Sequence, residues 1–109
     1  MSNNSILQNI IDQRITVSDH RSGRTPPPVF LVKTLDVIAL KTKLVYKIIM
    51  TDGEIQGFGI VATKQLPKIR SFIIEDNATT ITLLDWFIMG VGGELGLVLM
   101  DFHLEHIQN

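Results

Sequence analysis

The residues of this chain that could form a metal site lie near its C-terminal end. Asp101, His103 and Glu105 alternate with the apolar residues Phe102 and Leu104. Alternate residues of a β-strand share one face, so these three polar side chains would lie together. A carboxylate–histidine–carboxylate trio can hold a transition metal. The polar alternation of a solvated strand face explains the pattern equally well, and we expect no metal and no cofactor.

No other arrangement of residue types indicates catalysis. The chain has no cysteine, which excludes thiolate nucleophiles, thiolate zinc sites and disulfides. The glycine-rich run over residues 90–93 is not a phosphate-binding P-loop, because no Lys-Ser/Thr pair follows it. No Ser–His–Asp set or pair of carboxylates stands out by its spacing. We therefore expect a protein that is not an enzyme and has no small-molecule substrate.

Basic side chains form two groups that are suited to binding a partner. Lys41, Lys43 and Lys47 are separated by even numbers of residues, so an extended strand that begins early places them on one face. Val45 shares that face. The second group consists of Lys64, Lys68 and Arg70. Each group can be interpreted in two ways. It is either a surface that binds a protein or a phosphate-bearing partner, or a set of separate solvated side chains.

Aromatic residues are few, and most lie within apolar runs. Proteins that bind single-stranded nucleic acid stack bases on exposed rings. Phe58, between Gly57 and Gly59, is the best candidate for such a ring, although its position favours the core. Trp86 and Phe87 are adjacent, so a strand points one ring inward and the other outward, where it would support a protein interface.

Composition predicts one globular domain. The chain has 109 residues, of which 45% are apolar and 19% are charged, and this argues against disorder. All ten Lys and Arg residues lie between Arg14 and Arg70, whereas residues 75–109 carry acidic side chains and no Lys or Arg. This asymmetry indicates either an acidic or polyanionic partner or oppositely charged segments that pair in the fold.

The sequence also indicates where in the cell the protein resides. No apolar stretch approaches the roughly 20 residues that a membrane-spanning helix needs. The first residues lack the basic region of a secretory signal. We expect a cytosolic or nuclear protein.

The hydrophobic patterns predict a mainly β fold with a short N-terminal helix. Ser5 is a suitable N-cap for a helix over residues 6–14, and a proline-rich loop follows over 17–28. Apolar and β-branched runs then predict a barrel over 29–107, with a helical turn between the third and fourth strands. The five strands are expected at residues 29–40, 44–50, 54–60, 78–89 and 95–107. Five strands with bends predict one five-stranded Greek-key OB-fold domain over residues 1–109.

Several segments resemble one known family. Residues 46–53, Tyr-Lys-Ile-Ile-Met-Thr-Asp-Gly, are similar to a hairpin in the N-terminal domain of the replication protein A large subunit. Residues 60–66 resemble that family's apolar-Leu-Ala-Thr-Gln-Leu segment, with one extra residue. Weaker similarities cover the helix over 6–15, the first strand near 28–36 and the closing hairpin over 92–104. The order and spacing of these segments carry the resemblance, which covers most of the chain.

The resemblance implies an OB-fold domain of a nuclear single-stranded-DNA-binding protein. In that family the domain recruits replication, repair and checkpoint proteins through a basic cleft. The cleft accepts acidic amphipathic helices, and the domain binds single-stranded DNA only weakly. Such recognition combines an apolar groove with flanking cations.

The sequence departs from the family pattern at the cleft. Lys47 keeps one cation, whereas Val45 and Ile38 stand where basic residues are usual. Glu94 lies where the closing hairpin is usually basic, and Lys41 or Lys43 could compensate. These departures from the family pattern imply a groove that suits a less charged partner, as in a divergent lineage or in a specialised paralogue, for example one associated with telomeres or telomerase. The expected groove residues are Lys47, Lys43, Lys41, Ile38, Val45 and Glu94.

Two alternatives to partner recruitment stay open at this point. One is direct, weak binding of single-stranded or telomeric DNA, which needs at least two exposed aromatic rings beside lysines. Its expected contacts are Lys64, Lys68, Arg70 and Phe58. The other is a structural module that docks on another subunit or domain, which predicts a large exposed apolar patch.

Overall fold

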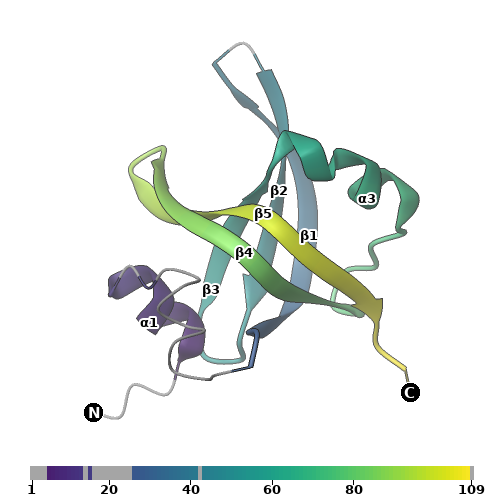
Figure 1. The fold of residues 1–109 in the computed structure, drawn as a ribbon, viewed down its shortest axis with the longest axis horizontal. Coiled ribbons are helices and arrows are strands. Elements are labelled where there is room, and N and C mark those ends of the chain that lie inside the picture. The colour runs from purple at the N-terminus through teal and green to yellow at the C-terminus, as the bar shows by residue number, and fades with distance from the viewer. Residues whose placement is uncertain (1–4, 14, 16–25, 42, 109) are drawn as a thin grey trace.

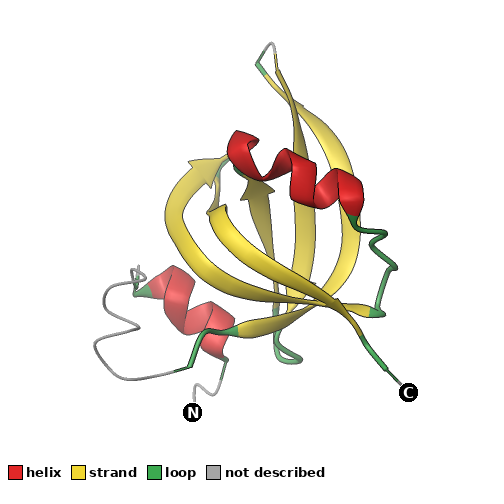
Figure 2. Cartoon of the chain, turned by 45° about the vertical axis from the view of Figure 1, so that its right-hand side comes forward, coloured by secondary structure: helices red, strands yellow, loops and turns green. Residues whose placement is uncertain are grey.

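The computed structural model describes residues 5–13, 15, 26–41 and 43–108, and the fold is mainly β with a five-stranded sheet (Figure 2). Within these described residues, two short α-helices and one 3-10 turn accompany the strands. The elements in chain order are α1 (Ile6–Asp12), β1 (Val29–Leu40), β2 (Lys43–Thr51), β3 (Gln56–Val61), η1 (Thr63–Gln65), α3 (Leu66–Ser71), β4 (Thr79–Val91) and β5 (Glu94–His106). None of the helices in the described ranges is long and apolar enough to span a membrane.

The strands pair in the order β1-β2-β3-β5-β4, and β1 also pairs with β4, so the sheet closes as a barrel. Among the strand pairs of the described ranges, only β3–β5 is parallel. β1 pairs with β4 only over Val29–Val32, and its remaining residues continue along β2. The register shifts after Val32 in β1 and near Asp85 in β4. Such irregularities bend long strands, which lets β1 and β4 curve around the barrel.

The core lies inside the barrel, and a helix packs at each of two ends (Figure 1). Phe30, Phe102, Leu97 and Leu99 are fully buried among the inward side chains of all five strands. The helix α1 contributes Leu7 and Ile10 to this cluster, and α3 contributes Ile69. Both helices therefore present only one apolar stripe to the barrel, as expected for short surface helices.

α1 is anchored to the β2–β3 connection through Asp52. Ser5 Oγ donates a 2.6 Å hydrogen bond to Asp52 Oδ2, and the Leu7 N–H donates to the same oxygen at 3.0 Å. Ser5 Oγ also accepts from the Gln8 N–H, so Ser5 is the N-cap that the sequence predicts. The other carboxylate oxygen of Asp52 accepts from the N–H groups two and three residues ahead, at 2.9 and 3.1 Å.

The structure corrects several predicted boundaries. α1 ends at Asp12 instead of residue 14, because Gln13 leaves the helical conformation with ψ near 0°. β3 begins at Gln56 instead of residue 54, because Asp52 organises a longer connection than a two-residue hairpin. Gly90 and Val91 belong to β4, so the turn contains only Gly92 and Gly93, which have positive φ values of 59° and 87°. Residues 17–25 of the predicted loop lie outside the described residues.

Candidate functional site

Four strands present a row of side chains on the outside of the barrel. Lys47 on β2 is the register partner of Ile60 on β3, which is the parallel partner of Val98 on β5. Val98 in turn lies opposite Phe87 on β4. Directly opposed residues in neighbouring strands point to the same face, so these four side chains form one continuous row. Ile60 and Val98 are buried, whereas Phe87 is 50% exposed.

A second row runs beside the first. Ile49 on β2 lies opposite Phe58 on β3, and Met89 on β4 lies opposite Gly96 on β5. A Cβ atom added at Gly96 would overlap the ring of Phe58, so the absence of a side chain there lets the ring lie against β5. Phe58 is only 5% exposed, which confirms its predicted burial and leaves no open ring face for a base.

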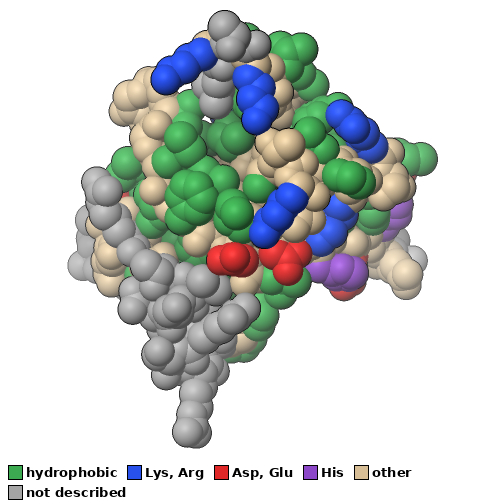
Figure 3. Space-filling view, turned by 45° about the horizontal axis from the view of Figure 1, so that its top comes forward, with side chains coloured by type: hydrophobic (Ala, Val, Ile, Leu, Met, Phe, Trp, Pro, Cys, Tyr) green, Lys and Arg blue, Asp and Glu red, His purple; other side chains and the backbone are tan. Residues whose placement is uncertain are grey.

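We call the outward side chains of these two rows, together with Glu94, the outer face. Its members are Lys47, Ile49, Phe58, Ile60, Phe87, Met89, Glu94 and Val98. They alternate along their strands with inward residues such as Ile48, Leu97 and Leu99, which belong to the core cluster. Figure 3 shows a face on which hydrophobic side chains gather, with Lys and Arg side chains above them and to their right and Asp or Glu side chains below. The outer face is therefore separate from the barrel core.

Lys47 and Glu94 line one hollow of about 140 Å³ on the outer face, together with Ile49, Gln56, Gly57 and Phe58. The Lys47 ammonium lies 4.7 Å from the centre of the Phe58 ring, which is a cation–π distance. Glu94 is exposed at the start of β5. Among the residues that the structure describes, neither Lys47 nor Glu94 forms an ion pair, with each other or with a third group.

A second hollow of about 340 Å³ lies at the end of β4. Lys41, Met89, Gly90, Val91 and Gly92 line it. Val91 lies opposite Glu94 in the β4–β5 register, so one lining residue of each hollow belongs to this strand pair. The surface is therefore an apolar area bounded by Lys47 and Lys41 on the β1–β2 side and by Glu94 on the β4–β5 side.

The predicted groove residues on β1 and β2 do share a face. Ile38 lies directly opposite Val45, and Val45 alternates with Lys43 and Lys47 along β2. Both apolar residues are half-buried. The ammonium of Lys43 does not line either hollow, because it donates a 2.9 Å hydrogen bond to Thr63 Oγ1 of η1.

Lys41 differs from the prediction, because it does not belong to the strand. β2 begins at Lys43, and Lys41 has a positive φ of 56° in the turn that precedes it. The even spacing that places Lys43 and Lys47 on one face of β2 therefore does not extend to Lys41. This turn nevertheless carries Lys41 to the second hollow.

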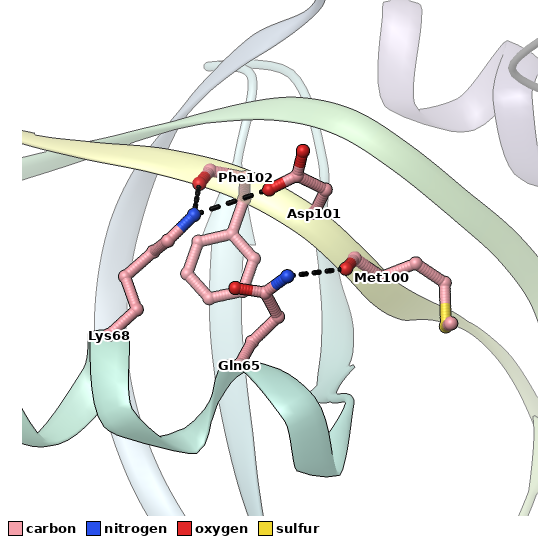
Figure 4. A network of polar contacts seen from close by, with 5 residues as sticks. All are labelled: Gln65, Lys68, Met100, Asp101 and Phe102. Carbon is pink, nitrogen blue, oxygen red and sulfur yellow. Dashed lines mark hydrogen bonds and ion pairs between the residues drawn. The ribbon is translucent and has the colours of Figure 1, made fainter.

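The predicted DNA contacts lie on two parts of the fold, with Lys64, Lys68 and Arg70 on the η1–α3 segment and Phe58 on β3. Lys68 forms a 3.2 Å ion pair with Asp101, also donates to the Phe102 carbonyl, and lies 5.0 Å from the Phe102 ring centre (Figure 4). Gln65 donates to the Met100 carbonyl at 2.8 Å in the same contact. Lys68 therefore fastens α3 to β5. Lys64 and Arg70 are exposed on the helical segment, and Phe58 lies buried on the outer face of β3.

The exposed aromatic ring is Phe87. Trp86 points inward and donates from Nε1 to the Ile15 carbonyl at 3.0 Å, as the alternation of adjacent rings predicts. All seven aromatic side chains lie in the described ranges, and Phe87 is the one that is exposed. Sequence reasoning left open which of the two adjacent rings faces outward, and the period-2 pattern of β4 decides it.

Asp101, His103 and Glu105 do not form a common site. Asp101 pairs with Lys68, whereas His103 Nε2 lies 3.2 Å from Glu105 Oε1 at an exposed position. Within the described part of the chain, no group of three His, Asp or Glu side chains is placed to hold a metal ion.

Two comparisons with known proteins identified no relative of this chain. No model of a known protein family matches the sequence, and no curated protein matches it.

Proposed function

We propose that this barrel is an OB-fold whose outer face recruits partner proteins by binding an amphipathic helix. The strand order β1-β2-β3-β5-β4 with one parallel pair, β3–β5, supports the fold assignment. So does the helical segment between β3 and β4. OB-folds are five-stranded Greek-key barrels that commonly bind their ligands on the outside of the sheet.

The row Lys47–Ile60–Val98–Phe87 is the observation that carries the proposal. Four strands are separated by three spacings of about 4.8 Å, so the row is roughly 14 Å wide. An α-helix with its side chains is about 10–12 Å in diameter, and it fits across this width. The apolar face of the helix would cover Phe87 and Met89, which are 50% and 36% exposed. Burying such side chains supplies about 1.5–3 kcal/mol each when it is complete.

Lys47 and Lys41 would contact acidic side chains on the helix. Neither lysine has an ion-pair partner among the described residues, so a carboxylate from a partner would not displace an existing contact. Cations at the rim of an apolar groove contribute mainly to orientation and to the association rate.

The similarity of residues 46–53 to the replication protein A hairpin supports a role in DNA metabolism. On this proposal the domain belongs to a nuclear, replication protein A-like protein and brings replication or repair factors to single-stranded DNA. The half-buried pair Ile38–Val45, where that family is basic, favours a partner with fewer acidic residues.

Direct binding of single-stranded DNA is less well supported. That function needs several exposed rings beside free cations. Phe87 is exposed, but Phe58 is buried and the Lys68 ammonium is held by β5. DNA binding and subunit docking therefore remain outcomes that the test distinguishes.

The test is NMR shift mapping on the isotope-labelled chain. An acidic amphipathic peptide and a short oligothymidylate are titrated separately. The proposal expects the peptide to shift the amide signals of Lys47, Phe58, Phe87 and Met89. Shifts with the oligonucleotide around Lys64 and Arg70 alone would favour DNA binding. Silence with both ligands, together with self-association of the chain, would favour subunit docking.

A further inference from the structure

We infer that the outer face selects a helix with unlike charges on its two flanks, acidic beside Lys47 and basic beside Glu94. The inference rests on the proposed function, because it specifies the partner of the same surface. Lys47 and Glu94 line one hollow from different strands, β2 and β5, without forming an ion pair. The surface therefore carries two separated, opposite charges that flank one apolar floor.

The position of Lys47 limits where its charge can act. Its ammonium lies over the Phe58 ring, 4.7 Å from the ring centre, and its side chain is half-buried. Asp36 is its register partner on β1, yet the two form no ion pair. A carboxylate that approaches over Phe58 would meet the ammonium at the edge of the apolar floor.

Glu94 faces the same floor from the other side. It is exposed at the first position of β5, and no positively charged side chain other than Lys47 lines its hollow. A helix with carboxylates on both flanks would place one of them near Glu94, where like charges repel. A helix with a lysine on that flank would gain an attraction instead. Glu94 is therefore the residue that sets the preference.

The hollow between the two charges fits one aliphatic side chain. Its floor is the Phe58 ring, which lies against Gly96, and Ile49 adds a second apolar surface. A helix that inserts one such residue brings its neighbours three and four positions away onto the two flanks. The helix can lie in either direction, so a peptide with unlike flanks can always align its acidic side with Lys47.

The experiment compares two synthetic helical peptides with the same stripe of leucines. One carries Glu on both flanks, and the other carries Glu on one flank and Lys on the opposite flank. Fluorescence anisotropy at low salt gives their dissociation constants for the wild-type chain. We expect the peptide with unlike flanks to bind about fivefold more tightly, which is the scale of an exposed charge pair.

Two variants and a control separate the outcomes. Glu94→Lys should reverse the preference, and Glu94→Gln should abolish it. Glu75→Lys makes the same charge change at an exposed site in the turn before β4. It should leave the preference for the peptide with unlike flanks intact. Tight binding of both peptides with no preference in the wild type would overturn the inference and leave the proposed function standing. If neither peptide binds, both fail. Amide spectra verify that each variant is folded.

Discussion

Phe58 on β3 packs so closely against Gly96 on β5 that no side chain fits between the ring and the β5 backbone. This contact crosses the one parallel strand pair of the barrel. It also fixes the ring beneath the Lys47 ammonium. One glycine therefore sets the depth of the outer face.

Gly96→Ala is expected to push the Phe58 ring out of its site. The added Cβ overlaps a rigid ring, so the variant should lose about 1–3 kcal/mol in the free energy of unfolding. Urea denaturation measures the loss. Gly90→Ala is the matched control, because its Cβ would meet only the Glu94 carbonyl oxygen at 3.9 Å and should leave stability nearly unchanged. Equal stability of both variants would refute the close contact.

Phe87→Ser is expected to weaken binding of an acidic amphipathic peptide about tenfold or more with little effect on stability. The ring is already 50% exposed, so the fold loses little buried area. Isothermal calorimetry measures the affinity. Ile73→Ser removes an even more exposed apolar side chain, at 76%, from the segment after α3 and serves as the control. Equal weakening by both variants would place the binding site elsewhere.

Lys68→Met is expected to destabilise the packing of α3 on β5. The substitution removes the ion pair with Asp101 and the hydrogen bond to the Phe102 carbonyl. Because this ion pair is partly exposed, the expected cost is about 1 kcal/mol. Hydrogen exchange of the α3 amides should accelerate. Lys64→Met, an exposed position on η1, should show neither change.

Asp52 makes the anchoring of α1 dependent on pH. Partial burial acts to raise its pKa, but hydrogen bonds from Ser5 Oγ and from the N–H groups of Leu7, Glu54 and Ile55 lower it from 3.8 to about 2. Because its pKa is lowered in the folded state, ionised Asp52 contributes fully to the free energy of unfolding above about pH 4. This contribution is lost as the pH falls toward 2. The full shift would correspond to about 2.4 kcal/mol, and solvent screening of this partly exposed carboxylate makes the contribution smaller.

Asp52→Ala tests this linkage. The variant should be less stable at neutral pH, and its stability should fall less than that of the wild type between pH 4 and pH 2. Asp76→Ala, at an exposed turn position, is the control and should keep the pH profile of the wild type. Parallel profiles for all three proteins would show that Asp52 has an ordinary pKa. Denaturant titrations at several pH values give the data.

Local patterns were enough to predict the strands and part of the site. Alternation places Val45 and Lys47 on one face of β2, and the resemblance adds Ile38, which the antiparallel β1–β2 register places opposite Val45. The contributions of Phe87 and Met89 could not be predicted, because they reach the outer face only through the pairing of β4 with β5 and of β5 with β3. These contacts join distant parts of the chain, and the periodicity of residues within one strand does not indicate which strands pair.

The function of Lys68 was missed for a related reason. The sequence alone predicts that Lys68 is part of a partner-binding surface or a separate solvated side chain, but α3 packs on β5 and brings it to Asp101, 33 residues later. Phe102 and Leu104 are buried, so the alternation of Asp101, His103 and Glu105 holds along β5. Asp101 nevertheless pairs with Lys68, which the strand pattern alone could not indicate.

Intermolecular methyl NOEs test the central claim most directly. The chain is labelled at the methyl groups of Ile, Val and Met, and an unlabelled acidic amphipathic peptide is added. We predict NOEs from the peptide to Ile49 and Met89, which line the two hollows of the outer face. NOEs confined to Ile73 and Ile107, which are exposed outside that face, would contradict the account.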